Sequence, residues 1–218
     1  MGGVRRYQAP QGSVACLRLS SPASGTGASL PGSSRSFSSP SSSRSPGFLA
    51  SSRASNHRNA CACLKTIPSA EADFRANDRD DNKVNDFWVG DVSRLYYLEV
   101  KRQPLRLIER SVADADGAPK EPLQDARSKA RFRFAAMKFD ETGAPYDRGG
   151  GRNPEKYGFC AYPETYQAKK TWYQSSVDLS QFTFIVNEDN VIWKKDLGGA
   201  PAVKWPKDPP AEGWSKLD

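Results

Sequence analysis

Residues 49–76 read LASSRASNHRNACACLKTIPSAEADFRA, and this stretch predicts an amphipathic helix. Its apolar residues recur at helical steps of three and four, and together they form one narrow apolar stripe. Such a stripe is sufficient to pack the helix on a sheet. Pro68 stands inside the pattern, which continues beyond it, so we expect a kink or a one-turn break rather than an end. The stripe consists of Ala60, Leu64, Ile67 and Phe74, with Glu71 in the same series.

The sequence after this helix predicts β-strands. Four segments are rich in aromatic and β-branched residues and are bounded by Gly, Pro, Asp or Asn: RLYYLEV (94–100), RFRFAAMKF (131–139), YGFCAYP (157–163) and QFTFIVN (181–187). The tetrapeptide NEDN supplies a turn, and VIWKKD returns as the partner strand of a hairpin. A helix followed by antiparallel strands predicts an α+β fold, in which the kinked helix packs on one face of the sheet.

Two Pro- and Gly-rich stretches are expected to be irregular. Residues 140–158 read DETGAPYDRGGGRNPEKYG and form a long connection between two strands. Its DRGGGR segment lacks the Lys-Ser/Thr pair of a phosphate-binding loop, so we interpret it as a flexible connection. The chain closes with LGGAPAVKWPKDPPAEGWSKLD, which we expect to be anchored on the sheet by Trp205 and Trp214.

Composition divides the chain into a tail, a helix and a β-rich region, with predicted bounds of 1–46, 47–76 and 77–218. The formal net charge is +7, but no Asp or Glu precedes Glu71, and the first 70 residues carry eight Lys and Arg. The remainder holds 24 Lys and Arg against 25 Asp and Glu, so its net charge is near −1. The basic character therefore belongs to the tail and does not indicate a nucleic-acid partner.

The tail is rich in Ser and Arg, and its sequence predicts disorder. It is typical of a transit peptide, of a disordered tail, or of residues translated from a wrongly assigned start codon. No apolar run in the chain approaches the ~20 residues of a membrane-spanning helix.

The most suggestive polar cluster is NDRDDNKVNDFWVGD (77–91). Asp78, Asp80, Asn82 and Asp86 have the spacing of positions one, three, five and nine of a calcium loop, with a backbone carbonyl of Lys83 or Val84 between them. Lys83 stands where the sharp turn prefers Gly, and Val89 stands where an EF-hand has its Glu. The alternative is a polar turn in which side chains bind the backbone.

The sequence gives little indication of disulfides, of a zinc site or of catalysis. Cys16, Cys61, Cys63 and Cys160 lack disulfide or zinc spacing, and His57 is the only histidine, so we expect small buried thiols. The carboxylates form no acid and base pattern, and we expect a protein that is not an enzyme. The numerous aromatic residues are expected mostly in the core, although some could form an exposed platform. They include Trp88, Tyr96, Tyr97, Tyr157, Tyr162, Tyr166, Trp172, Tyr173 and Trp193.

The helical stretch resembles the second half of the long N-terminal helix of bacterial type IV pilins and of type II secretion pseudopilins. The C-terminal half, with GFCAYPETY, FTFIVNEDNVIWKKDLGG and a closing W-S-K-L, is similar to an uncharacterised domain of exported bacterial proteins. The pilin-like match comprises Pro46, Leu49, Ser52, Arg53, Asn56, Ala60, Leu64, Lys65, Thr66, Ile67 and Ala70, while His57 replaces the usual Glu.

The resemblance implies a cell-envelope protein that assembles with its own copies or with secretion-system components. In such proteins a hydrophobic half-helix of about 20 residues anchors the precursor in the inner membrane. The Ser/Arg-rich tail occupies that place here, so we expect that the native reading frame differs upstream of about residue 45. Leu49, Ala60, Leu64, Ile67 and Phe74 are the expected helix contacts, and calcium is the possible cofactor. The alternatives are an exported β-rich module whose aromatic face binds a glycan or peptide and, ranked last, a hydrolase of unknown kind.

Overall fold

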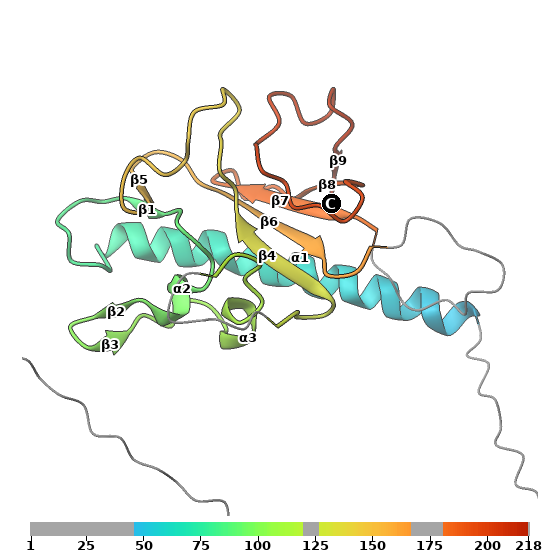
Figure 1. Cartoon of the computed structure of the whole chain (residues 1–218), viewed down its shortest axis with the longest axis horizontal. Helices are drawn as coiled ribbons and strands as arrows, with labels where there is room; N and C mark the ends of the chain where they lie inside the picture. The colour runs from blue at the N-terminus through green and yellow to red at the C-terminus, as the bar shows by residue number, and fades with distance from the viewer. Residues whose placement is uncertain (1–45, 120–126, 167–180, 218) are drawn as a thin grey trace, which may run out of the picture. The chain divides into compact units, whose positions relative to one another are not determined.

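The computed structural model describes residues 46–119, 127–166 and 181–217, which belong to one compact unit, Ser43–Asp218. The predictions for residues 1–45, Trp172 and Tyr173 lie outside the described residues, as does the side chain of Leu49. Within these limits the fold is an α+β arrangement of one long helix packed with antiparallel sheets, as the sequence predicts (Figure 1).

The long helix α1 runs from Pro46 to Ala76 without interruption, so the one-turn break at Pro68 does not occur. A kink at Pro68 stays a prediction. The predicted apolar stripe is confirmed, because Leu64 and Ile67 are fully buried and Ala60 and Phe74 are 1% exposed. α1 contacts strands β1, β4, β6 and β7, whose bounds follow.

The main sheet has five antiparallel strands in the order β4-β6-β7-β8-β9. Its bounds are β4 Phe132–Ala136, β6 Gly158–Pro163, β7 Thr183–Asn187, β8 Trp193–Lys195 and β9 Ser215–Lys216. The predicted hairpin is confirmed as β7 and β8, with Ile185 opposite Trp193. β9 corrects the expectation that the C-terminal stretch is irregular throughout, since its two residues pair with β8.

Every residue of β7 is buried, because both faces of the strand are covered. On one face the Phe184 ring meets the imidazole of His57 from α1, with ring centroids 5.6 Å apart. On the other face the Thr183 hydroxyl donates a hydrogen bond to the carbonyl of Ala200, at 3.0 Å. The C-terminal stretch therefore forms the second cover of the sheet, and Trp205 and Trp214 are both 7% exposed there, as expected of anchoring residues.

The prediction of a strand over residues 94–100 is wrong for its first half. Residues Arg94–Tyr97 form a helical turn, α2, and only Glu99–Val100 (β2) is extended, paired with β3, Gln103–Pro104. The turn forms because the Asp116 carboxylate accepts the backbone N–H groups of Val92 and Ser93, at 2.8 Å each. This tertiary contact outweighs the β propensity of the aromatic run. A second helical turn, α3, spans Arg110–Ala113.

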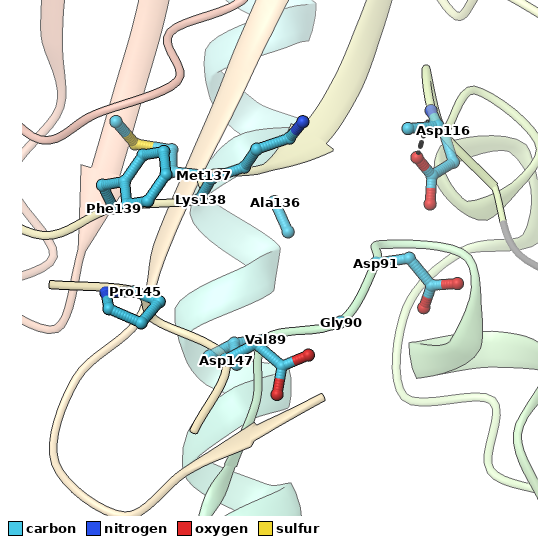
Figure 2. A pocket seen from close by; sticks show the side chains of 11 residues that line it. Val89, Gly90, Asp91, Asp116, Ala136, Met137, Lys138, Phe139, Pro145 and Asp147 are labelled. Carbon is cyan, nitrogen blue, oxygen red and sulfur yellow. Dashed lines mark hydrogen bonds between the residues drawn. The ribbon is translucent and has the colours of Figure 1, made fainter. Parts of the chain in front are cut away.

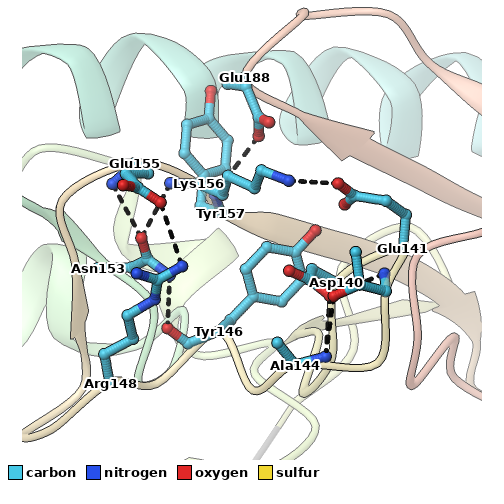
Figure 3. A network of polar contacts seen from close by, with 11 residues as sticks. Asp140, Glu141, Ala144, Tyr146, Arg148, Asn153, Glu155, Lys156, Tyr157 and Glu188 are labelled. Carbon is cyan, nitrogen blue, oxygen red and sulfur yellow. Dashed lines mark hydrogen bonds and ion pairs between the residues drawn. The ribbon is translucent and has the colours of Figure 1, made fainter.

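The connection at 140–158 is also more ordered than the sequence predicts. Its residues Arg152–Asn153 form β5, which pairs with β1, Phe87–Trp88, directly after the acidic loop. The Asn153 side chain organises the bend, because its amide donates to the Tyr146 carbonyl at 2.8 Å and its oxygen accepts the N–H groups of Glu155 and Lys156. Figure 3 shows this network. The neighbouring Arg152 forms an ion pair with Asp80, which lies in the loop after α1.

Candidate functional site

The acidic loop directly follows α1, and the structure brings its four predicted residues together. The Asp78 carboxylate accepts the backbone N–H groups of Asn82 and Lys83, each at 3.0 Å. The Asn82 amide donates to one oxygen of Asp80 and one of Asp86, at 3.1 Å in both cases. The loop thus closes on itself, with the Asn82 side chain between two carboxylates.

Lys83 makes the sharp turn that the sixth position of such a loop requires. Its φ is +68°, in the left-handed region that a residue with a side chain adopts at a cost. Lys83 therefore adopts the backbone conformation for which Gly is preferred at this position, and the absence of Gly does not prevent the turn.

Two residues of this site were missed by the sequence analysis. Arg152, from β5, forms an ion pair with Asp80, whose side chain is 4% exposed. Glu71, in the last turns of α1, is fully buried, and its carboxylate accepts the backbone N–H of Trp88 at 2.8 Å. Glu71 falls in the apolar helical series, and its burial could have been predicted from that position.

The surroundings of Asp86 disfavour its negative charge, because its side chain is buried and because Asp78 and Asp80 lie in the same loop. Burial raises the pKa of Asp86, and the neighbouring charges of Asp80 and Asp78 act in the same direction. Burial raises the pKa of Glu71 well above its ordinary value. In the part of the chain that the structure describes, no group of three or more His, Cys, Asp or Glu side chains is arranged to hold a metal ion.

A cavity of about 390 Å³ lies beside β1 and β4 (Figure 2). Asp91 and Asp116 stand on one side of it, and Met137 and Phe139 stand on the other. Burial raises the pKa of Asp116 to about 6, although three backbone N–H groups donate to its carboxylate. Asp91 accepts the indole N–H of Trp88 at 3.0 Å. Each carboxylate therefore accepts hydrogen bonds from neighbouring turns and holds them in place. This is a structural role.

The burial of α1 differs between its two halves. From Ser51 to Asn59 every side chain is exposed or half-buried, whereas the buried series begins at Ala60 and ends at Phe74. The first half contacts the sheet through the half-buried His57, whose ring lies against Phe132, Phe182 and Phe184, but it has no fully buried side chain. It presents small and polar side chains to its surroundings, and Arg58 is exposed there.

The aromatic residues that the structure describes are buried or half-buried, apart from Phe139. Trp88, Tyr157, Trp205 and Trp214 are buried, and the Tyr and Trp residues outside the core are half-buried. The exposed large apolar side chains in the described ranges are Val84, Phe139 and Val203. The alternative of an aromatic binding face stays a prediction.

Comparison with known proteins does not identify a relative: no family model, no curated protein and no solved structure matches the chain.

Proposed function

We propose that the protein is a pilin-like or pseudopilin-like subunit of the bacterial cell envelope, which acts without catalysis by assembling through α1 with its own copies or with secretion-system components. The observation that carries this proposal is the uneven burial of α1. Its second half lies on the sheet, and its first half, residues 51–59, has no buried side chain.

This arrangement suits assembly because a long helix gains most of its stability from packing. The 31 residues of α1 correspond to about 46 Å of helix, and the buried side chains lie in its second half, while His57 is the residue of the first half whose ring packs on Phe132 and Phe184 of the sheet. A neighbouring helix would cover the small side chains of Ser51, Ala54 and Ser55, which allow close approach of two backbones.

Anchoring in the inner membrane is part of the proposal only where a hydrophobic segment precedes α1 in the native protein. None of the helices in the described ranges has the length and apolar character needed to cross a membrane. Mass spectrometry of the native N-terminus, together with translation of the upstream DNA in all frames, addresses this part. An apolar segment of about 20 residues joined near Phe48 is the expected result.

Assembly is tested with a matched pair of substitutions on α1 in the protein expressed in its own cells. Ala54 and Ala72 are both exposed alanines, and they lie in the first and second halves of the helix. Ala54→Arg should abolish cross-linked multimers in the envelope fraction, whereas Ala72→Arg should retain them. A wild-type protein that is monomeric and absent from the envelope fraction would overturn the proposal, as would equal loss of multimers in both variants.

A further inference from the structure

The interior of the acidic loop contains carboxylate oxygens without a hydrogen-bonding partner. The side chains of Asp80 and Asp86 are both more than nine-tenths buried. In each of them one carboxylate oxygen accepts no hydrogen bond. One oxygen of Glu71, which is fully buried close by, is in the same state. Buried charged groups without partners are costly, so native proteins pair them or use them to bind metal ions.

The groups that now face these carboxylates compensate only part of their charge. The Asn82 amide supplies two neutral N–H donors to Asp80 and Asp86. Arg152 supplies one positive charge, at the oxygen of Asp80 that Asn82 also contacts. Asp78, Asp80 and Asp86 together carry three negative charges when ionised, so the loop retains an excess of negative charge.

We propose that this loop binds one calcium ion, with the carboxylates of Asp80 and Asp86 as its principal ligands. Calcium prefers six to eight oxygen ligands and accepts them in flexible geometry, which a short loop of alternating acidic and amide side chains supplies. Asn82 contributes its amide oxygen only after the amide turns over, which breaks its two N–H bonds to Asp80 and Asp86 and the bond that its oxygen accepts from the Val84 N–H at 2.7 Å. Coordination of the ion by both oxygens of each carboxylate has to offset these losses. The backbone carbonyl of Val84 is a further oxygen within the loop, whereas both oxygens of Asp78 accept the backbone N–H groups of Asn82 and Lys83 and hold the turn.

The ion would join three segments of the chain. The loop begins where α1 ends, Asp86 immediately precedes β1, and the partner of Asp80 is Arg152 on β5. Calcium therefore stabilises the connection between the helix and the β1-β5 ladder. This inference is independent of how the first half of α1 assembles.

Binding is tested on the full chain after treatment with EDTA and removal of the chelator. Titration calorimetry with CaCl₂ should give one site per chain, with a dissociation constant of about 10⁻⁵ to 10⁻³ M. Terbium provides a second readout, because excitation of Trp88, two residues after Asp86, should sensitise its luminescence and calcium should quench it by displacement. Absence of both signals up to about 10 mM ion would overturn the proposal.

Asp81→Asn is the matched control for Asp80→Asn. Both variants remove one carboxylate from the same loop, but the Asp81 side chain is 38% exposed and pairs with Lys83 and Lys101. Asp80→Asn should weaken calcium binding by about tenfold or more, and Asp81→Asn should change it by less than about threefold. Equal losses in the two variants would mean that the loop attracts cations only through its net charge, and would overturn the assignment.

Two further variants separate a lost ligand from a lost fold. Asp86→Asn should weaken binding as Asp80→Asn does, while near-ultraviolet circular dichroism reports whether each variant is folded. Arg152→Gln removes the competing guanidinium, so calcium affinity should stay unchanged or increase. A loss with Arg152→Gln as large as that with Asp80→Asn would show that the ion pair, and not the ion, is what the loop requires.

Discussion

Replacing Leu64 with alanine should lower the free energy of unfolding by about 3 kcal/mol. Leu64 is fully buried where the second half of α1 meets the sheet. The substitution removes three carbon groups, which corresponds to about 2.4 kcal/mol of transfer free energy at ~0.8 kcal/mol each. The cavity left behind adds to this cost, because the surrounding strands relax only in part.

The measurement is urea denaturation followed by tryptophan fluorescence, with thermal unfolding as a second readout. For an ordered unit of this size, a loss of about 3 kcal/mol corresponds to a decrease of roughly 6–12 °C in Tm. Lys65→Ala is the control, because Lys65 is the next residue on α1 and is exposed. Its effect should stay within about 0.5 kcal/mol. A loss below about 1 kcal/mol for Leu64→Ala, or equal losses in the two variants, would refute the packing of this half of α1 on the sheet.

Three other predictions concern the loop, the cavity and the cysteines. Lys83→Gly should raise the free energy of unfolding by roughly 0.5–1 kcal/mol in calcium-free buffer, because φ is +68° at this position, and Lys83→Ala should give no such gain. Burial raises the pKa of Asp116 from 3.8 to about 6, so the stability that this group contributes is fully present below pH 3.8 and is lost as the pH rises through 6, by about 3 kcal/mol in all. Asp116→Asn should flatten this part of the curve of unfolding free energy against pH, and an equally steep curve in the variant would contradict the assignment. The three cysteines of the described residues are buried, and burial raises the thiol pKa to about 11 for Cys61 and about 12 for Cys160. At pH 8 a thiol reagent should therefore react rapidly with no more than one thiol of the native chain, that of Cys16, and with all four in denaturant.

The features that the sequence predicts correctly depend on residues close together in the chain. The helix stripe repeats within α1, and the β7-β8 hairpin joins strands separated by a short turn. The acidic loop was located because its candidate ligands occupy nine consecutive positions, from Asp78 to Asp86.

The features that the sequence does not predict depend on contacts between distant segments. The aromatic run at 94–100 begins as a helical turn because Asp116, more than twenty residues later, accepts two of the preceding N–H groups. Arg152 could not be assigned to the acidic loop because it lies 72 residues from Asp80 in sequence. Nothing in the local pattern of either segment indicates these partners.

The ion pair between Asp80 and Arg152 also bears on the order in which the chain folds. Closing a loop of about 70 residues costs more conformational entropy than extending a helix or zipping a hairpin. The helix α1 and the β7-β8 hairpin can therefore form before β1 meets β5, and the ion pair between Asp80 and Arg152 forms after these local elements. Loss of this pair through Arg152→Gln should then accelerate unfolding in stopped-flow experiments and leave the folding rate nearly unchanged. The ion pair would then determine how long the folded state lasts, and not how fast it is reached.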